Sequence, residues 1–491
     1  MKHRKFATVV LPFLFFTVLG FLVMGYHPGY EDDGAYLSAV KAVLNPALYP
    51  HDADFFRLQL QASVFDTAMA GVVRLTRIDL AWAELLVQFL SLALILWAGR
   101  GIARKLFTEI RAQWAAVAML AAMFTLPVAG TALFIADQHL HPRNLATACT
   151  AIAIWRILEN KAWQSIPCLC LSFAMHPIMG ALGISFCFFT WLIYLERAPE
   201  FPGKRRKAYP AALTTIPIFG PPNPAWRQAI ESKSYLFLNR WEWYEWLGAL
   251  APLFLFWFLA RIARRRGELN LSRFAYTVFA FSAFQQAVAI AMLTPHALIR
   301  LAPLQPMRYL QLVYVFLTLI AGGLIGRFLI RRSMWRWAVF LIVINGGMFV
   351  AQRALFASTP HLELPWRQPT NEWLQAFAWI RQHTPESAYF ALDPDYMEAP
   401  GEDYHGFRAL AERSQLADAE KDAAVVTQVP ELGPIWARQV QAQEGWRSFQ
   451  LADFERLKAE FGVDWVLVSY PQPGGLACRW HNSQLAVCQI P

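Results

Sequence analysis

The run ATVVLPFLFFTVLGFLVMG, from Ala7 to Gly25, decides the fold class of this chain. It holds 19 residues without a charge, and a helix of that length crosses the roughly 30 Å hydrocarbon layer of a bilayer. The basic stretch at 2–5 precedes the run, as in a signal peptide, but no small-x-small cleavage site closes it before Tyr26. We therefore interpret it as a retained first transmembrane helix.

The composition of the whole chain also indicates a membrane protein. Of its 491 residues, 56% are hydrophobic and only 16% are charged, too few to solvate an ordinary globular surface. The net charge of +9 divides into −8 from residue 357 onward and +17 before it. The basic excess lies in three short loops, which hold Arg100, Arg104, Lys105 and Arg111; Arg261, Arg264, Arg265, Arg266 and Arg273; and Arg327, Arg331, Arg332 and Arg336. Such loops mark the cytoplasmic side of a membrane, and no basic face for nucleic acid is indicated.

Eight further apolar runs are long enough to span a bilayer. They lie near residues 80–99, 113–135, 144–158, 165–194, 243–260, 274–293, 309–330 and 337–352. With the first helix, these runs predict a mainly α-helical polytopic protein of about nine or more spans, with a cytoplasmic N-terminus and a large first outer loop at 26–79. The basic residues at 204–207 would then lie outside, against the charge rule. The region 165–222 could instead hold a hairpin broken at His176-Pro177 and a short span at 211–219.

The boundary predicted at 356/357 separates a transmembrane domain (1–356) from a small extracytoplasmic α/β domain (357–491). In the latter, the spacing of Trp373, Phe377 and Ile380 predicts a helix that ends before Pro385. Strands are predicted at 389–392 and 465–469, the second preceded by a helix at 453–461 with Gly462 as its C-cap. A hairpin is expected to close the chain.

Cysteine positions agree with this topology. Cys478 and Cys488 flank a predicted turn, and in an oxidising compartment they would form a disulfide across the terminal hairpin. The other four cysteines lie in apolar spans, where a small buried side chain is the ordinary role.

Three consecutive carboxylates, Glu31, Asp32 and Asp33, follow the first helix in the sequence YHPGYEDDG (26–34). Carboxylates this close raise one another's pKa unless a cation, a metal or a substrate proton compensates. The pattern predicts either a catalytic cluster or the acidic first turn of a helix in a solvated loop. Further along the loop, Asp54 lies among aromatic residues, as expected at a lipid interface, and is a second candidate for substrate binding.

This architecture resembles the GT-C superfamily of membrane glycosyltransferases, and within it uncharacterised bacterial proteins. The likeness rests on the many spans, the acidic pair directly after the first helix, the aromatic and proline-rich stretch behind it, and the C-terminal α/β domain. It implies a polyprenyl-phosphate-linked sugar as donor. By motif position it also implies that Asp32 or Asp33 acts as general base or orients the acceptor. Sugar and acceptor are not implied.

The second outer loop, DQHLHPR at 137–143, places an acid, two imidazoles and a guanidinium within seven residues. Asp137, His139 and His141 could bind a divalent metal such as Mg or Mn if the loop is extended. The alternative is a polar cluster beneath a cavity, in which the two histidines contact substrate. No cofactor is predicted with certainty.

Arginine is the expected ligand for a lipid phosphate, because its forked donors match phosphate oxygens. Arg143 is the leading candidate, followed by Arg300 and Arg308 of a later outer loop. Arg308 could instead extend its charge to the lipid interface.

Two further features have both an ordinary and a functional interpretation. His176 beside Pro177 suggests a helix break with a hydrogen-bonded imidazole, or an intramembrane functional group. Trp243 and Glu245 open a span and suggest an interfacial aromatic belt, or a sugar-binding surface in which the indole stacks and the carboxylate accepts hydroxyl hydrogen bonds.

No glycine-rich phosphate loop, dinucleotide fingerprint or paired metalloprotease histidines occur in the sequence. We expect a glycosyltransferase of the bacterial inner membrane that transfers a hexosyl or pentosyl group to a glycan, lipid or protein on the periplasmic side. The alternatives are a transporter or flippase of lipid-linked saccharides and a non-catalytic assembly protein with a sensing tail. A transporter should carry charges inside its helices, whereas here the carboxylates cluster in loops.

Overall fold

The computed structural model describes residues 2–61, 63–194 and 223–491. Within these ranges, six helices are long and apolar enough to cross a membrane by length and composition. They are α5 (Leu80–Leu106), α9 (Pro177–Tyr194), α11 (Trp243–Arg265), α12 (Leu269–Leu293), the run Pro306–Ile330 that contains η6, α13 and η7, and α14 (Met334–Leu355). Shorter apolar helices lie at Val9–Met24 within α1 (Lys2–Met24), at Ile110–Ala122 (α6) and at Ala162–Met175 (η1 and α8). The chain is a mainly helical, multi-pass membrane protein.

Two predicted apolar runs are interrupted in the structure. The run at 113–135 ends as a helix at Ala122 and continues into a short hairpin of β1 (Pro127–Val128) and β2 (Leu133–Phe134). Pro127 has no N–H to continue a helix. The run at 165–194 divides into α8 (Ser165–Met175) and α9, with His176 extended between them. This is the break that the sequence offered as an alternative, while the short span expected at 211–219 and the basic residues at 204–207 lie outside the described residues.

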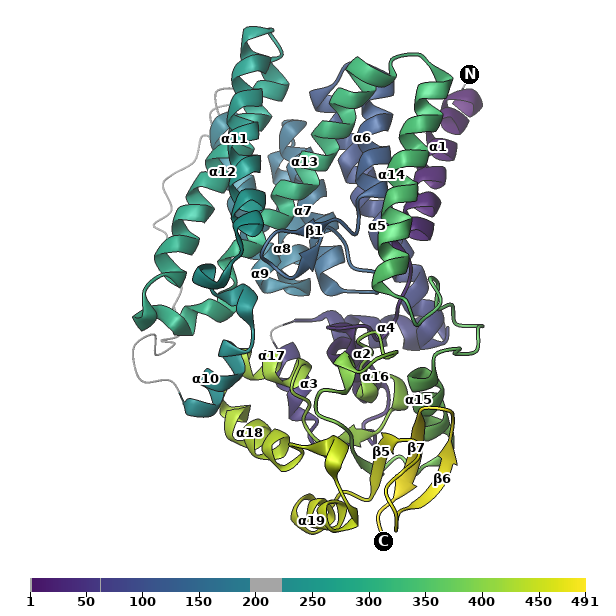
Figure 1. Ribbon diagram of the computed structural model, residues 1–491. Helices are drawn as coiled ribbons and strands as arrows, with labels where there is room; N and C mark the ends of the chain where they lie inside the picture. Colours follow the sequence, from purple (N-terminus) through teal and green to yellow (C-terminus); the bar gives the residue numbers. More distant parts are fainter. Residues whose placement is uncertain (1, 62, 195–222) are drawn as a thin grey trace.

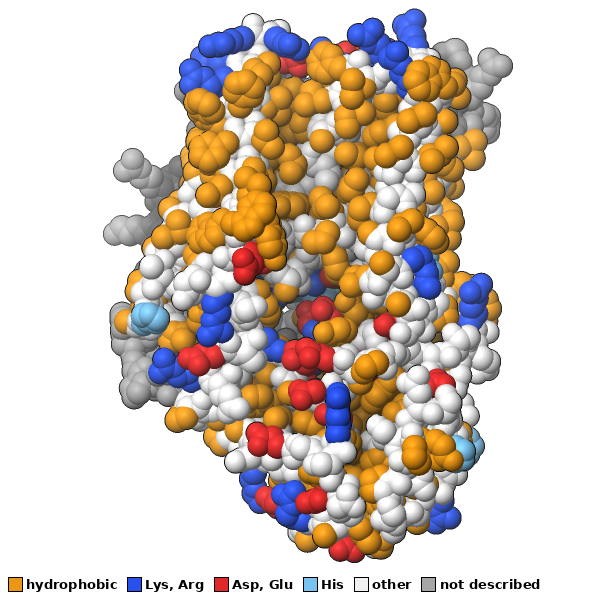
Figure 2. Space-filling view, viewed as in Figure 1, with side chains coloured by type: hydrophobic (Ala, Val, Ile, Leu, Met, Phe, Trp, Pro, Cys, Tyr) orange, Lys and Arg blue, Asp and Glu red, His pale blue; other side chains and the backbone are white. Residues whose placement is uncertain are grey.

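The turns rich in arginine meet at one end of the helical bundle. Arg327, in η7 (Gly326–Ile330), pairs with Glu109 at 3.0 Å and with Glu268 at 2.8 Å. Glu109 lies in the turn between α5 and α6, and Glu268 lies in the turn between α11 and α12. The guanidinium of Arg327 therefore joins these two turns to the one that follows α13. This end lies opposite to the C-terminal sheet (Figure 1), and a broad band of hydrophobic side chains lies between the two ends (Figure 2).

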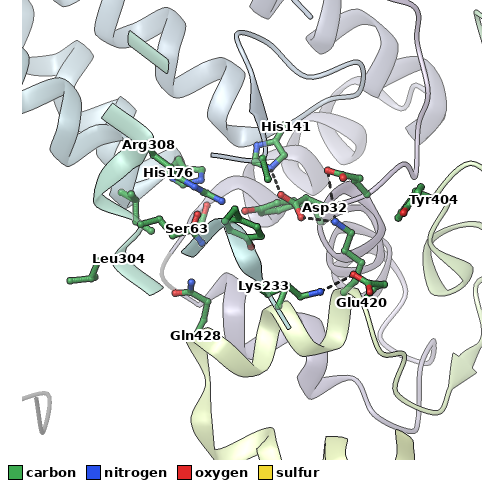
Figure 3. Close-up of a pocket in the computed structure, with 18 of the residues that line it drawn as sticks. Asp32, Ser63, His141, His176, Lys233, Leu304, Arg308, Tyr404, Glu420 and Gln428 are labelled. Carbon is green, nitrogen blue, oxygen red and sulfur yellow. Dashed lines mark hydrogen bonds and ion pairs between the residues drawn. The ribbon is translucent and has the colours of Figure 1, made fainter. Parts of the chain in front are cut away.

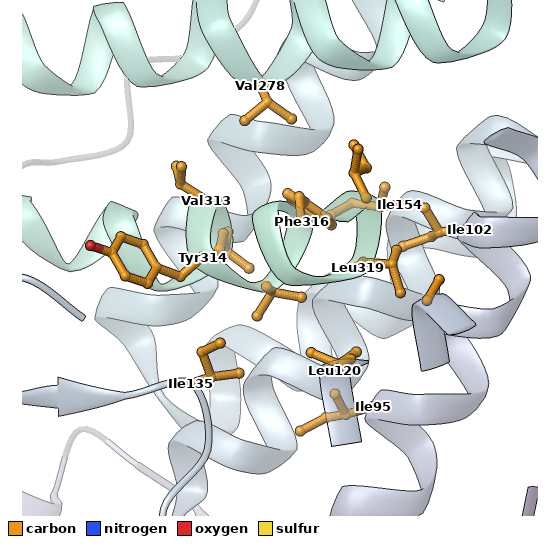
Figure 4. Packing of buried hydrophobic residues seen from close by; sticks show 14 of the residues in the cluster. Ile95, Ile102, Leu120, Ile135, Ile154, Val278, Val313, Tyr314, Phe316 and Leu319 are labelled. Carbon is orange, nitrogen blue, oxygen red and sulfur yellow. The ribbon is translucent and has the colours of Figure 1, made fainter. Parts of the chain in front are cut away.

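The centre of the helical core is α13 (Leu310–Ile325). Phe316 and Leu319 are fully buried in one apolar cluster with side chains of α5, α6 and α7 (Pro142–Leu158) (Figure 4). A Cβ atom at Gly322 would lie 2.5 Å from the carbonyl oxygen of Ala115, so the close approach of α13 and α6 requires glycine there. Small residues therefore allow close packing of the helices that carry the loops described below.

A five-stranded sheet with flanking helices forms the C-terminal region (residues 357–491). The strand order is β4-β3-β5-β7-β6, with β3 parallel to β4 and β5 and the remaining pairs antiparallel. The strands are β3 (Tyr389–Ala391), β4 (Ser414–Gln415), β5 (Trp465–Ser469), β6 (Ala477–His481) and β7 (Leu485–Gln489). The helices are α15 (Glu372–His383), α16 (Phe407–Ala411), α17 (Lys421–Gln428), α18 (Gly433–Ala442) and α19 (Leu451–Phe461).

The elements predicted in this region are present. The helix of Trp373, Phe377 and Ile380 is α15, the strand at 465–469 is β5, and Gly462 ends α19 with a positive φ of 78°. Neighbouring β5 side chains face two separate apolar clusters, as the two faces of a covered sheet require. Cys478 and Cys488 are joined by a disulfide across the β6–β7 hairpin.

The first loop (residues 26–79) packs against the C-terminal region. It forms α2 (Asp33–Leu44), α3 (Asp54–Leu60) and α4 (Phe65–Thr76). A Cβ atom at Gly406 would lie 2.6 Å from the Cα of Gly34, so two glycines allow the backbones before α16 and at α2 to touch. Lys41 pairs with Glu412 at 2.7 Å. These contacts bring the acidic stretch after α1 against the start of the C-terminal helices.

Candidate functional site

A cavity of about 480 Å³ lies where the membrane helices meet the first loop and the C-terminal region. Figure 2 shows a hollow edged by acidic and basic side chains below the hydrophobic band, and Figure 3 shows the side chains that line the cavity. The ionisable lining residues are Glu31, Asp32, His141, His176, Lys233, Arg308, Glu398, Tyr36, Tyr235, Tyr404, Glu420 and Lys421. Segments far apart in the sequence therefore supply one strongly charged site.

A tight turn directs two of the three consecutive acids into this cavity. Gly29 and Glu31 have positive φ values of 80° and 51°, and the N–H of Glu31 donates to the carbonyl of Tyr404 at 2.8 Å. Glu31 and Asp32 line the cavity, whereas Asp33 turns away, is 2% exposed and accepts the N–H of Gly29 at 2.6 Å. Burial raises the pKa of Asp33 to about 7, against the effect of that hydrogen bond. Of the predicted catalytic acids, Glu31 and Asp32 reach the cavity.

The ammonium of Lys421, at the start of α17, lies between these two acids. Its Nζ is 3.3 Å from Oδ1 of Asp32 and 3.8 Å from Oε2 of Glu31. Burial by itself raises the pKa of Asp32, but Lys421, followed by His141, holds that pKa well below its usual range. Burial raises the pKa of Glu31 despite the same lysine. Asp32 is therefore ionised, and 36% of its side chain is exposed.

His141 lies on the other side of Asp32. Its Nδ1 accepts the N–H of Arg143 at 2.9 Å, which leaves the proton of a neutral ring on Nε2, 3.7 Å from Oδ2 of Asp32. Burial, then Arg143, lowers the pKa of His141, so the neutral ring is favoured. Nε2 is buried and has no hydrogen-bond partner in the described parts of the chain. His141 can therefore direct a donor toward the cavity carboxylate.

Arg143 does not line the cavity, although the sequence made it the leading phosphate ligand. Its Nε and terminal nitrogen donate to both oxygens of Asp137 at 3.0 and 2.7 Å, and its side chain is buried. The carbonyl of Asp137 accepts from Gln88 at 2.7 Å, so the pair belongs to a buried network. Burial opposes ionisation of Asp137, but Arg143 lowers its pKa to about 2. Asp137 therefore occupies two of the three nitrogens of this guanidinium, and Nη1 is buried without a partner among the described residues.

The loop at 137–143 also differs from the metal site that its sequence suggested. His139 is 2% exposed and does not line the cavity, and its ring centroid is 5.7 Å from that of His141. Burial lowers the pKa of His139 to about 3. Among the residues that the structure describes, no group of three or more His, Cys, Asp or Glu side chains could hold a metal ion.

Arg308, in η6 (Pro306–Tyr309), is the arginine that reaches the cavity. Its side chain makes no hydrogen bond or ion pair with any residue in the described ranges, and its Nε is buried without a partner. Figure 3 places it beside His176, across the cavity from Asp32. Lys233, on a third side, pairs with Glu420 at 2.8 Å. An unpaired guanidinium beside open space is suited to bind an anion.

The remaining candidates lie away from this cavity. Asp54 lines a separate depression between the first loop and α18, and Arg300 lies in η5 (His296–Leu304), outside the lining. Trp243 is 74% exposed, and Glu245 accepts the N–H of Glu242 at 2.8 Å in the capping box of α11. Glu245 therefore caps a helix, and neither residue lines the cavity.

Several lining residues escaped the sequence analysis. Lys233, Tyr235, Tyr404, Glu420 and Lys421 lie in polar segments with no motif spacing. Only the docking of the C-terminal region brings Lys421 to the first loop, and no local pattern signals such a contact.

No family model matches this sequence, and no curated protein matches it. Among solved structures, the chain is similar to the apo oligosaccharyltransferase of Archaeoglobus fulgidus, with a TM-score of 0.46 and 12% identity over 94% of this chain and 69% of that chain. It is also similar to oligosaccharyltransferase AglB of the same archaeon in complex with an inhibitory peptide and a dolichol-phosphate (TM-score 0.43, 12% identity, 94% and 70% covered). For a complex of the Archaeoglobus fulgidus oligosaccharyltransferase with Zn and sulfate, the TM-score is 0.42 and the identity 12%, over 93% of this chain and 68% of that chain. At 12% identity, these similarities concern the fold alone.

Proposed function

We propose that this protein is a membrane glycosyltransferase that moves a sugar from a polyprenyl-phosphate-linked donor to a glycan, lipid or protein acceptor. The observation that carries the proposal is the shared cavity, in which an ionised carboxylate, Asp32, lies across from an unpaired guanidinium, Arg308. Transfer from a sugar phosphate needs both groups, a base for the acceptor and a cation for the departing phosphate.

The proposed orientation puts the cavity and residues 357–491 on the extracytoplasmic, periplasmic side of a bacterial inner membrane. In support, the arginine-rich turns joined by Arg327 lie at the opposite end of the bundle, and such turns are retained in the cytoplasm. In this arrangement residues 1–356 form the membrane domain of nine or more spans. The C-terminal domain covers the cavity from outside.

The position of Arg308 fits a donor that is anchored in the bilayer. The apolar run that contains it extends from Pro306 to Ile330, so Arg308 lies at the very start of a candidate span. Lipid phosphates occupy this depth of a membrane. A donor could therefore keep its chain in lipid while its phosphate contacts Arg308 and its sugar enters the cavity.

The proposed reaction is a direct displacement. A lone pair on the acceptor oxygen or nitrogen forms a bond to the anomeric carbon, while the bond from that carbon to the phosphate oxygen breaks and its electron pair leaves with the phosphate. Asp32 takes the proton of the acceptor, and Arg308 stabilises the charge on the leaving phosphate. The configuration at the anomeric carbon is inverted.

The test is transfer by the purified full chain from a labelled polyprenyl-phosphate sugar to added acceptors. We expect labelled acceptor to form in step with free polyprenyl phosphate. A chain that forms no product with any such donor, yet moves labelled lipid-linked sugar between the leaflets of a vesicle, is a transporter and refutes the proposal.

A further inference from the structure

Two carboxylates of the cavity share a single positive charge, and it comes from the protein itself. Adjacent acids need a cation, a metal ion or a proton to coexist, and the Nζ of Lys421 lies within 4 Å of both Glu31 and Asp32. We infer that Lys421 is a built-in counter-cation that occupies the place of a divalent metal, so that the cavity functions without one. This inference rests on the proposed function, because it concerns the acid assigned there as the base.

The N-terminus of α17 fixes the position of Lys421. The carboxylate of Asp418 accepts the backbone N–H groups of residues 420, 421 and 422 at 3.0, 2.6 and 3.1 Å, which caps the helix directly below the lysine. One residue later, Asp422 receives two hydrogen bonds of 2.8 Å from Arg408, and both side chains are buried. The backbone that carries Lys421 is therefore held by a buried, charge-paired network.

The other end of α17 is attached to the remainder of the cavity wall. The side chain of Gln428 donates to the carbonyl of Pro303 in η5 at 3.0 Å, and the indole of Trp226 donates to the carbonyl of Thr427 at 3.1 Å. Trp226 is in α10 (Pro224–Glu231), which precedes the Lys233 side of the cavity. The docked C-terminal region thus presents Lys421 to the acids in a defined place.

The surroundings of the two acids favour the lysine over a bound metal ion. A divalent ion between Glu31 and Asp32 would meet the ammonium at close range and be repelled. The neighbouring acid Asp137 is occupied by Arg143. Without the lysine, however, the two carboxylates would face one space with no cation between them, and carboxylate oxygens suit Mn²⁺. Removing the ammonium should therefore create a metal site.

Direct binding of Mn²⁺ to the detergent-solubilised full chain tests this inference without any substrate. Measured by electron paramagnetic resonance of the free ion, wild-type protein should show no tight Mn²⁺ site. Lys421→Ala should bind one ion about tenfold or more tightly than wild type. Lys421→Arg retains the charge and should resemble wild type. Lys41→Ala removes another lysine that joins the first loop to the C-terminal region, through Glu412, and should gain no site.

Activity provides the second measurement. Transfer by wild-type protein should survive EDTA, whereas Lys421→Ala should lose transfer and regain part of it with Mn²⁺. The inference is overturned if wild-type protein binds one Mn²⁺ that Asp32→Asn removes, if EDTA abolishes wild-type transfer, or if Lys421→Ala elutes as a folded protein and gains no Mn²⁺. Absence of transfer in every variant would refute the proposed function, and the Mn²⁺ titrations would still decide on Lys421.

Discussion

The ammonium of Lys421 lies 3.3 Å from the carboxylate of Asp32, although 389 residues separate them in the sequence. The contact joins α17 of the C-terminal region to the loop that follows α1, so neither part contains the whole site. It also keeps the Asp32 carboxylate ionised, because Lys421 is the largest of the influences that lower the pKa of Asp32 against the effect of burial.

The two candidate arginines should behave differently when they are changed. Arg308 has an open cavity before it and no partner within the described residues. Arg308→Lys and Arg308→Met should therefore weaken binding of a polyprenyl-phosphate donor by about 1 to 3 kcal/mol, the range for charge-assisted hydrogen bonds, as measured by calorimetric titration.

Arg143→Met is the matched comparison. It leaves the buried carboxylate of Asp137 without its partner, and loss of one member of a buried pair costs about 3 to 5 kcal/mol of folding free energy. Its thermal midpoint should fall markedly. The contradicting outcome is an Arg143→Met protein of normal stability with weakened donor binding, together with unchanged donor binding in the Arg308 variants. That result would show that Arg143 binds the phosphate.

Stability should depend on pH through His405 in the C-terminal region. Both ring nitrogens of this fully buried residue face acceptors, with Nδ1 3.1 Å from the carbonyl of Glu402 and Nε2 3.2 Å from the carboxylate of Glu363. Burial disfavours the charged ring, but Glu363 raises the pKa of His405 to about 9. Because the pKa of His405 is higher in the folded protein than its value near 6.5 in the unfolded chain, the charged ring stabilises the fold fully below pH 6.5. This stabilisation is lost as the pH rises through 9.

The thermal midpoint of the wild-type protein should therefore fall between pH 6.5 and 9, with a loss on the order of 3 kcal/mol attributable to His405. His405→Gln has no charge to lose and should show a flatter profile over the same interval. Parallel pH profiles for the two proteins would show that the ion pair with Glu363 contributes nothing to this dependence.

The orientation in the membrane gives a third prediction. In sealed spheroplasts, added protease should cut within residues 357–491, because the C-terminal region is proposed to face outward. An epitope inserted in the arginine-rich turn after η7, at 331–333, should stay protected until lysis. The reverse pattern would place the cavity in the cytoplasm and remove the rationale for a periplasmic acceptor.

Local patterns in the sequence predicted the parts of this structure that depend on neighbouring residues. The spacing of Trp373, Phe377 and Ile380 indicated α15, and Gly462 indicated the end of α19. The helix end at Ala122 was missed because the apolar run continues unbroken through a hairpin whose backbone pairs with itself. Hydropathy alone cannot separate these two forms of buried backbone.

The site was only partly predictable for a different reason. The acidic stretch at 31–33 identified the correct loop, but the turn geometry that sends Asp32 inward and Asp33 to the N–H of Gly29 is not visible in the sequence. The position of Arg143 in a short polar loop suggested a free ligand, whereas a bidentate pair with Asp137, six residues away, holds it outside the cavity lining. Lys421 depends wholly on tertiary docking.

The most direct test of the central claim compares Asp32→Asn with Asp33→Asn in transfer from a labelled polyprenyl-phosphate sugar. Asparagine keeps the size of the side chain and removes the base, so Asp32→Asn should lower turnover by about 10² to 10⁴. Asp33→Asn retains an acceptor for Gly29 and should keep turnover within about tenfold of wild type. A double variant detects substitution of one acid by the other. Wild-type turnover in Asp32→Asn and in the double variant, or a loss confined to Asp33→Asn, would contradict the assignment of Asp32 as the catalytic base.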